Sequence, residues 1–400
     1  MSEVLVIGGG FAGMWAALSA AREFALCGRA ESVVLVAPEP YLTIRPRLYE
    51  AGPQSMRAPL GPLLETAGVR FVQGEVQAID ADARAVSITA PGGEAILNWS
   101  RLVVATGSAA HAPDIPGLAE HGFSVDDYSS ALKFDAHLAR ICTRPLEAPA
   151  TTFAIVGGGF TGIELACEMR DRIAAHANEH TAQIARIVLI EQAGEIGPDL
   201  GPGPRAEILA ALEAARIELR LGARIVRIGA EAVHFGNGDA LPSQTVVTTA
   251  GQRALIPRGL EAAHRDRLGR LHTDTGLRVE GYDDIFAAGD AAFARVDEVG
   301  HTALMSCQHA MPMGRFAGSN AARSLLGREL LPYRQERYVT CLSLGRSGAV
   351  FTSGWDRTVQ KTGAEAGALK QAINTKWIYP PEGSRDELFA LANPLAQAAR

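Results

Sequence analysis

Short apolar runs and longer amphipathic stretches alternate along the first part of the chain. The runs at 4–7 (VLVI) and 32–36 (SVVLV) are too short for helices and have the continuous apolar character of buried parallel strands. Between them, residues 11–28 place apolar side chains at helical spacing, and Gly28 is positioned to end the helix. This pattern predicts a strand, a helix and a second strand, which is a βαβ unit.

The same order of elements returns in the middle of the chain. An apolar run at 152–156 (TFAIV) precedes a helical pattern at 160–175, and the run 186–191 (RIVLIE) closes the unit. Further strands are expected within 69–88, 101–107, 246–254, 283–292 and 338–354. The alternation of strands and helices predicts the α/β class, with two Rossmann-like dinucleotide-binding domains and a small C-terminal α+β region.

A glycine-rich turn joins the strand to the helix in each unit. In the pattern G-x-G-x-x-G, the first glycine allows a tight turn, the second lets backbone N–H groups approach a pyrophosphate, and the third lets the helix pack on the strand. The N-terminus of the following helix adds partial positive charge. Two complete copies therefore predict two bound dinucleotides. The six glycines are Gly8, Gly10, Gly13, Gly157, Gly159 and Gly162.

The residue that ends the second strand of each unit differs between the copies. Glu191 ends the second copy, where a carboxylate can bind both ribose hydroxyls of an adenosine and would repel a 2′-phosphate, so NADH is favoured over NADPH. In the first copy the matching residue is Ala37, and the nearest carboxylate is Glu39. Either Glu39 reaches back to the ribose or the ribose is held by backbone and water, and Glu39 is then a solvated loop acid.

Composition and charge exclude several classes of protein. Lys plus Arg number 38 against 44 Asp plus Glu, a net charge of -6, and no basic run of the kind that binds nucleic acid occurs. The five cysteines form no C-x-x-C pair and no spacing typical of a metal site, so neither a metal nor a redox-active disulfide is expected. The chain lacks a basic leader and any run of about 18 apolar residues, which favours a cytoplasmic protein and leaves surface attachment open.

Three segments have the same pattern, in which an apolar strand runs into a turn of small residues. The turns end on Thr106 and Gly107, on Gly251, and on Gly289 and Asp290. With the two glycine turns, these segments resemble the two-dinucleotide-binding flavoproteins, specifically type II NADH dehydrogenases, over nearly the whole chain. The resemblance implies that the first glycine turn holds the FAD pyrophosphate, that Thr106 and Gly107 pack on the flavin nucleotide, and that Asp290 binds the ribityl and phosphate side. The alternative for Asp290 is a helix N-cap.

The resemblance also assigns Arg45 and Glu164. Arg45 lies in the stretch PYLTIRPRLYEAG and could pair with an FAD phosphate, although a surface arginine is the plain alternative. Glu164 falls in the first turn of the second helix, where the family carries a glutamate near the nicotinamide and the flavin. A carboxylate there is also favourable simply because it faces a helix N-terminus.

Chain order implies a discontinuous FAD domain and an inserted NADH domain. Residues 1–115 and 275–325 are expected to bind FAD and to bracket an NADH domain at 116–274, followed by a C-terminal region at 326–400. The nicotinamide C4 must lie roughly 3 to 3.5 Å from the flavin N5 for hydride transfer, so the two clefts should face each other.

The stretch after Asp290 resembles the family helix that begins under the flavin. Its start, which includes Cys307 and Gln308, is expected to aim N–H groups at the flavin, and Gln308 matches a glutamine of the flavin and quinone site. Pro312 and Met313 stand where the family commonly has two glutamines, which weakens the prediction of ubiquinone as the acceptor, and the proline is expected to interrupt the helix. Sulfide chemistry at Cys307 would need a second cysteine, and packing is the favoured use of His309.

These observations predict an FAD-dependent NADH dehydrogenase in which Glu164 and Gln308 act at the reacting groups. The electron acceptor is expected to be quinone-like or another small molecule. One rival is a specialised flavin oxidoreductase or oxygen-using enzyme acting on a secondary metabolite, and another is an NADH-responsive redox-sensing or partner-binding flavoprotein. A homodimer, and at most weak peripheral contact with the inner face of the membrane, stay open.

Overall fold

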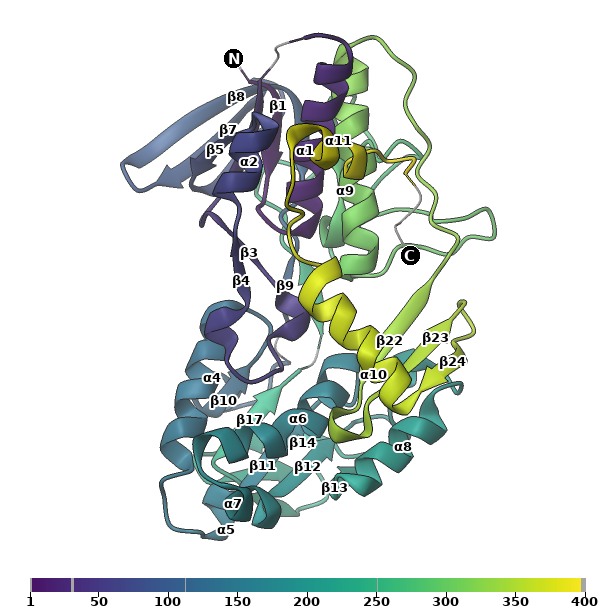
Figure 1. Ribbon diagram of the computed structural model, residues 1–400. Helices are drawn as coiled ribbons and strands as arrows, with labels where there is room; N and C mark the ends of the chain where they lie inside the picture. The colour runs from purple at the N-terminus through teal and green to yellow at the C-terminus, as the bar shows by residue number, and fades with distance from the viewer. Residues whose placement is uncertain (1, 30–31, 112, 250, 397–400) are drawn as a thin grey trace.

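The computed structural model describes residues 2–29, 32–111, 113–249 and 251–396 of the chain. Figure 1 shows two lobes, one above the other, and a C-terminal segment that runs between them. We call the lobe that contains the N-terminal strand the first lobe and the other the second lobe. Within the described residues, no helix combines the length and apolar character that a membrane crossing requires.

The first lobe is built on a mainly parallel sheet. Its strands follow the order β5-β2-β1-β8-β7-β6, and β20 also pairs with β8. The strands of this sheet are β1 (Ser2–Ile7), β2 (Val33–Ala37), β5 (Arg70–Gln73), β6 (Glu75–Asp80), β7 (Ala85–Ala90), β8 (Gly93–Val104) and β20 (Ile285–Ala287). The antiparallel pair β6–β7 confirms the paired strands expected within 69–88, and β7 pairs in turn with β8. Because β20 comes from much later in the chain, the lobe is assembled from two separate segments.

Helices α1 (Phe11–Leu26) and α9 (Cys307–Leu325) lie side by side in the first lobe (Figure 1). Their backbones touch at glycine, since a Cβ on Gly314 would lie 2.2 Å from the carbonyl oxygen of Ala12, and one on Gly318 would lie 2.0 Å from that of Ala16. Going from Gly314 to Gly318 along α9, the contact moves from Ala12 to Ala16 along α1, so the two helices are parallel and their N-termini point the same way.

The second lobe repeats the βαβ arrangement around a five-stranded parallel sheet in the order β10-β17-β11-β12-β13. The strands are β10 (Gly122–Ser124), β11 (Thr152–Val156), β12 (Arg186–Ile190), β13 (Ile217–Arg220) and β17 (Thr245–Thr248). Helix α6 (Phe160–His176) follows β11, and helices α4 (Tyr128–Ile141) and α8 (Arg205–Ala214) complete the layers. The fold is therefore α/β with two Rossmann-like units, as expected.

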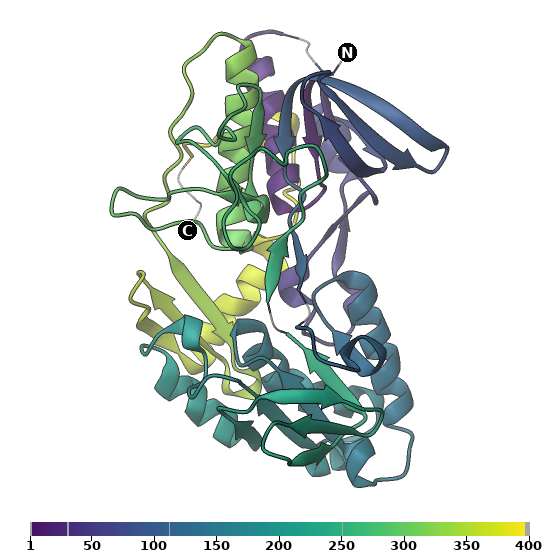
Figure 2. The same cartoon turned by 180° about the vertical axis from the view of Figure 1, so that it is seen from behind.

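Two short strands carry the chain between the lobes. Strand β9 (Ser108–Ala110) leads out of the first lobe and pairs with β18 (Gln252–Ala254), which leads back. Figure 2 shows the two crossovers running side by side. The Leu255 N–H donates to the Gly107 carbonyl at 2.9 Å, so the ladder extends beyond the strands themselves. The lobes are thus joined by a two-stranded ribbon rather than by two independent linkers.

The C-terminal region packs on both lobes. Strands β22 (Val339–Ser343), β23 (Ala349–Ser353) and β24 (Thr358–Thr362) form an antiparallel sheet, followed by α10 (Gly363–Ala372), a π-helix (Ile373–Trp377) and α11 (Arg385–Leu391). Leu342 and Val350 belong to the apolar core of the second lobe. Ile378 and Leu388 belong to the core of the first. The region is α+β, and its two halves anchor in different lobes.

The expectation that Pro312 interrupts its helix is wrong. Helix α9 runs without a break through Pro312. A proline lacks the N–H that would bond to the carbonyl four residues earlier, here that of Gln308. That carbonyl instead accepts a hydrogen bond from the Gln335 side-chain amide at 3.2 Å. A donor from a distant segment replaces the missing backbone bond, which a local pattern cannot reveal.

Candidate functional site

The first glycine turn forms an open cradle at the N-terminus of α1. Gly8 has a φ of +108°, and a Cβ there would lie 2.2 Å from the Ala105 carbonyl oxygen. A Cβ on Gly13 would lie 1.8 Å from the Gly8 carbonyl oxygen, so only glycine allows this packing of helix on turn. In contrast, a Cβ on Gly10 would meet nothing within 4 Å. No side chain caps α1, and its first N–H groups are left for an anion such as a pyrophosphate.

The second glycine turn has the same construction at the N-terminus of α6. Gly157 has a φ of +113°, and a Cβ on Gly162 would lie 1.8 Å from the Gly157 carbonyl oxygen. A Cβ on Gly159 would meet nothing within 4 Å, and α6 likewise has no side-chain cap. Both cradles therefore fit the phosphates of a dinucleotide, since among the described residues nothing lies within 4 Å of the Cβ positions of Gly10 and Gly159.

The acids expected at the adenosine ends are held differently in the two lobes. Glu191 lies directly after β12, and its carboxylate accepts hydrogen bonds from the N–H groups of Gly158 and Ala193, each at 2.7 Å. It is thus fixed beside the second cradle. Glu39, in the first lobe, forms an ion pair with Arg57 and is half exposed. Its carboxylate already has a cationic protein partner.

Asp290 lies in a short 3₁₀ helix, Gly289–Ala291, directly after β20. Gly289 has a φ of +67°, which brings the turn against α1. The N-cap of the 3₁₀ helix is Ala288, so the alternative use of Asp290 as an N-cap does not apply. The Ser108 hydroxyl donates to the Asp290 carboxylate at 2.6 Å. Burial raises the pKa of Asp290, although Ser108 and Arg45 oppose the shift.

Thr106, Gly107 and Gly251 line the start and end of the crossover ribbon. The Thr106 hydroxyl donates to the Leu255 carbonyl across the ribbon. Gly107 and Gly251 have φ values of +73° and +66°, conformations that favour glycine. The Gly251 carbonyl accepts from the His111 N–H at 3.1 Å. These residues shape the exit from the first lobe, where β8 ends.

Arg45 makes its hydrogen bonds with protein groups. Its guanidinium donates to the Asp126 carboxylate at 2.7 Å and to the Ser108 carbonyl at 3.1 Å. It also lies 3.8 Å from the Asp290 carboxylate. Sequence reasoning proposed a phosphate as its partner and gave no indication of Asp126.

Helix α9 begins at Cys307, and Ser306 is its N-cap. Burial raises the pKa of the Cys307 thiol to about 11, so it is protonated at neutral pH and is a poor nucleophile. In the orientation that satisfies both polar atoms, the Gln308 amide donates to the Val339 carbonyl at 2.6 Å and accepts from the Val339 N–H at 3.1 Å. Gln308 therefore ties the start of α9 to the C-terminal sheet.

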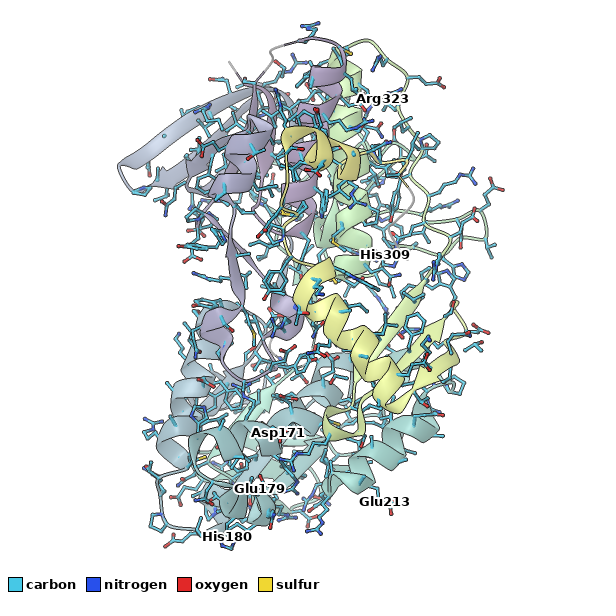
Figure 3. The ribbon with its side chains drawn as sticks, viewed as in Figure 1. Asp171, Glu179, His180, Glu213, His309 and Arg323 are labelled. Carbon is cyan, nitrogen blue, oxygen red and sulfur yellow. The ribbon has the colours of Figure 1, made fainter. Side chains whose placement is uncertain are left out.

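His309, labelled in Figure 3, lies near the start of α9 and is fully buried. Its ring stacks on Tyr338 with a centroid separation of 5.6 Å. Burial lowers the pKa of His309 to about 4, so the imidazole is neutral at physiological pH. These features fit the packing role expected for this histidine.

Glu164 is the fifth residue of α6, one position beyond the first turn in which the sequence placed it. Its carboxylate is paired with side-chain and backbone groups of the C-terminal region. It lies 2.7 Å from the Lys370 ammonium of α10 and accepts from the Ser343 N–H at 2.9 Å. Both side chains are buried. Burial lowers the pKa of Lys370, but the Glu164 carboxylate raises it on balance, which keeps the ammonium charged.

Lys370 is the functional residue that the sequence interpretation missed. Its ammonium contacts Glu164, and its charge lowers the pKa of the Cys307 thiol against the larger effect of burial. Figure 1 shows α10 between the two lobes. Ala366, Lys370 and Asn374 recur at helical spacing and are all buried in the structure, but two of the three are polar, so the sequence alone does not mark this face as buried.

A second carboxyl follows Glu164 on the same helix face. Glu168 is one turn further along α6, and burial together with Asp171 and Glu50 raises its pKa to about 7. Arg172, on the next turn, opposes the shift. Burial also raises the pKa of Glu164, but Lys370 and the Ser343 N–H oppose that shift, so among the described residues Glu168 is the acid of this face without a charged partner as close as Lys370.

Comparisons with known proteins agree with this arrangement. Residues 2–314 match the family described as pyridine nucleotide-disulphide oxidoreductase. The chain is 45% identical over 401 residues to an NADH dehydrogenase-like protein of Mycobacterium tuberculosis, and 99% of each chain is covered. It is 31% identical over 360 residues to a demethylphylloquinone reductase of Synechocystis, which covers 88% of this chain and 86% of that protein.

A solved structure shares the fold. The NDH2 protein of Plasmodium falciparum, in complex with NADH, superposes with a TM-score of 0.78 at 14% identity, covering 98% of this chain and 97% of that one. The match extends through the C-terminal region, so the whole arrangement of lobes and C-terminal sheet is shared.

Proposed function

We propose that this chain, which belongs to the pyridine nucleotide-disulphide oxidoreductase family, is an FAD-dependent NADH dehydrogenase that passes electrons to a quinone-like acceptor. The observation that carries the proposal is that strand β22 contacts the starts of both α9 and α6. Its Val339 is hydrogen-bonded to Gln308, at the start of α9 in the first lobe, and its Ser343 N–H donates to Glu164, the partner of Lys370 near the start of α6. The two nucleotide-binding units therefore contact the same strand.

The first lobe provides the residues to hold FAD, which when bound accepts a hydride from NADH and passes two electrons on. Gly8, Gly10 and Gly13 present the backbone of the first cradle, and Asp290 offers a carboxylate to hydroxyl donors on the ribityl side. Thr106 and Gly107 shape the adjoining wall.

The second lobe provides the residues to hold NADH. Gly157, Gly159 and Gly162 form the cradle, and the fixed carboxylate of Glu191 can accept from both ribose hydroxyls. A 2′-phosphate would lie against that carboxylate and be repelled, so we expect NADH to be preferred. Gly251 lies where β17 leads into the returning crossover, close to this cleft.

Glu164 and Lys370 supply a proton at the meeting point of the lobes. Reduction of a quinone to a quinol consumes protons, and a buried site needs a group that can hold one. Lys370 holds a proton at Nζ, 2.7 Å from a Glu164 carboxylate oxygen that can accept it or stabilise the charge. Gln308 acts beside them by fixing the start of α9 to Val339.

The same proposal assigns residues 1–115 and 275–325 to the FAD domain, 116–274 to the NADH domain and 326–400 to the C-terminal region. It places the protein in the cytoplasm, with peripheral contact at the inner face of the membrane through exposed apolar side chains such as Trp377 and Leu395, and allows a homodimer.

Anaerobic reduction tests the function directly. Purified protein is expected to carry FAD and to be yellow, and NADH is expected to bleach it within seconds. Reoxidation by a soluble quinone should then outpace reoxidation by oxygen. A preparation that takes up no FAD, or that NADH leaves yellow, contradicts the proposal. Equal rates with quinone and oxygen would instead favour an oxygen-using enzyme.

A further inference from the structure

Asp126 connects three segments that lie far apart in the sequence. One of its carboxylate oxygens accepts from the Arg45 guanidinium at 2.7 Å and from the Gln252 amide at 3.3 Å. The other accepts from the Ala110 N–H at 2.7 Å. Its main-chain carbonyl accepts from Arg45 Nε at 3.1 Å. Asp126 thus binds the outgoing crossover, the returning crossover and a loop of the first lobe at once.

Arg45 extends this network to the first lobe's cofactor site. It donates to the Ser108 carbonyl at 3.1 Å and to the Ser108 hydroxyl oxygen at 3.3 Å. The same hydroxyl donates to Asp290 at 2.6 Å. A continuous series of hydrogen bonds therefore runs from Asp290, through Ser108 and Arg45, to Asp126 at the entrance to α4 of the second lobe.

We propose that Arg45 and Asp126 are positioning residues that fix the second lobe relative to the first. The inference rests on the proposed function, because it concerns how the NADH-binding cradle is aimed at the flavin-binding one. We call the hydrogen-bonded set Arg45, Ser108, Asp126 and Gln252 the crossover clamp. It holds both strands of the ribbon to a loop of the first lobe by charge-assisted hydrogen bonds.

Two lobes joined by short crossovers can move relative to each other at those crossovers. Relative motion of two lobes is expected unless their interface is large or specifically braced. Hinge motion is absorbed by a few residues at such connections, and these are the residues that the clamp holds. Hydride transfer requires close alignment of donor and acceptor, and a misplacement of about 1 Å costs about 100-fold in rate. The clamp therefore acts on the rate of hydride transfer rather than on cofactor affinity.

Variants of Asp126 separate this role from phosphate binding by Arg45. Asp126 is an acid, so it has no favourable contact with a cofactor phosphate. If Arg45 served mainly as a phosphate ligand, Asp126→Asn would leave it free and FAD binding would be retained or strengthened with an unchanged rate of reduction. If the clamp positions the lobes, Asp126→Asn slows reduction although FAD is retained.

The experiment compares Asp126→Asn and Asp126→Ala with the wild type in anaerobic stopped-flow mixing with NADH. We expect FAD content and the NADH dissociation constant to stay within about two-fold, while the rate constant for flavin reduction falls about 10- to 100-fold, more for alanine than for asparagine. The long-wavelength charge-transfer absorbance, which reports stacking of the nicotinamide on the flavin, should weaken in the same order. Reduction at the wild-type rate in both variants would overturn the proposal, and so would loss of FAD.

A second ion pair provides a matched control. Arg346 contacts Asp171 at 2.6 Å and joins the turn after β22 to α6, away from the crossovers; Figure 3 labels Asp171. Asp171→Asn removes the same charge from an exposed pair, and we expect wild-type reduction rates. A loss as large as that in Asp126→Asn would mean that removing an acid from an ion pair outside the ribbon has the same effect, which contradicts a specific clamp.

Limited proteolysis tests the clamp without turnover. Arg253 is exposed in β18, next to Gln252, and cleavage after it by trypsin can be followed by mass spectrometry. We expect Asp126→Ala to be cut there several-fold faster than the wild type, with or without FAD. An unchanged cleavage rate contradicts the clamp. If NADH did not bleach the wild type, the proposed function would be wrong. The cleavage rate after Arg253 would still show whether the clamp holds the ribbon.

Discussion

The two glycine cradles have almost the same backbone and different surroundings. The first glycines have φ values of +108° and +113°, and the two N-cap glycines are at φ −77°, ψ −171° and φ −81°, ψ −167°. The side chains that follow differ at each functional position. Ala37 stands where the second lobe has Glu191. Backbone sterics therefore explain the phosphate cradle, whereas single side chains explain what each cradle binds and does.

The position two residues after the last glycine shows the difference most clearly. In the first lobe this residue is Trp15, and the Arg315 guanidinium lies 3.9 Å above its ring. In the second lobe it is Glu164, paired with Lys370. Each pairs with a cation from a later helix. The first pair can only pack, because an indole cannot exchange a proton with arginine, but the second can hold and release one.

Replacing the third glycine of either cradle with alanine should have the largest effect. The variant in the first lobe should lose FAD, whereas the variant in the second lobe should lose only reduction by NADH. Gly13→Ala places a methyl group 1.8 Å from a carbonyl oxygen and is expected to yield protein without FAD. Gly162→Ala creates the same clash in the second lobe and should leave yellow protein that NADH bleaches more than about 100-fold more slowly. Visible absorbance and stopped-flow reduction measure both. Loss of FAD in Gly162→Ala, with the fold intact, would contradict the assignment of the cradles.

Removing Lys370, the cation paired with Glu164, should lower the stability of the protein. Lys370→Ala leaves the Glu164 carboxylate buried without its charged partner, so we expect a loss of about 3–5 kcal/mol in the free energy of unfolding. Adding Glu164→Gln should restore much of it. Urea unfolding of the two single variants and the double variant provides the cycle. If the change in the double variant equals the sum of the two single changes, the pair is not coupled.

Substitutions at Glu191, after β12, and at Ala37, at the end of β2, should affect the preference for NADH over NADPH only in the second lobe. Glu191→Ala removes the acid fixed beside Gly158, and we expect the ratio of kcat/KM for NADH over NADPH to fall about 10- to 100-fold, equivalent to about 1.4–2.7 kcal/mol. Ala37→Glu in the first lobe is the matched change and should leave that ratio unaltered. An unchanged ratio in Glu191→Ala would remove the ribose role from this residue.

The smallest expected effect concerns Glu168, whose counterpart in the first lobe is Ser19. Ser19 is neutral and donates to the Ala392 carbonyl at 2.9 Å, whereas the pKa of Glu168 is raised to about 7 by burial and nearby acids. A raised carboxyl pKa stabilises the fold most below the unfolded value of about 4.3, and this contribution is lost as pH rises through 7. Glu168→Gln should therefore raise stability by about 1–2 kcal/mol at pH 8 and by little at pH 5.

Urea unfolding at the two pH values tests this prediction. The groups that act on Glu168 are Glu164, Asp171 and Arg172 on its own helix and Glu50, which follows the short 3₁₀ helix Arg45–Arg47. Ser19→Ala, the matched change, is expected to destabilise equally at both pH values, because no titratable group is removed. A gain in Glu168→Gln that is the same at pH 5 and pH 8 would exclude titration as its cause.

The sequence was sufficient where a local rule decides the structure. The glycine turns, the helices after them and the parallel strands depend on sterics and on short-range periodicity, and all were predicted within a few residues. Glu191 was also found, because it directly follows its strand. The resemblance to a known family added Asp290 and Glu164 as candidates, although neither their partners nor their burial followed from it.

The partners of these residues could not be predicted because they come from distant segments. Lys370 lies more than 200 residues after Glu164, and Asp126 more than 80 after Arg45. Gln335 satisfies the carbonyl that Pro312 leaves free, and Val339 takes the amide that Gln308 was expected to offer to a ligand. Each is a tertiary hydrogen bond, so the helical pattern around it carries no trace of the donor.

The glycine contacts between α1 and α9 fix how far one helix extends beyond the other. Gly314 lies seven residues after the start of α9, whereas its neighbour Ala12 lies one residue after the start of α1. Helix α9 therefore overhangs α1 by about 9 Å, at about 1.5 Å per residue. The N-terminus of α1 would hold the phosphates of a dinucleotide bound in the first cradle, and the N-terminus of α9 lies about 9 Å beyond it. The glycine contacts thus keep the two positive helix ends a fixed distance apart.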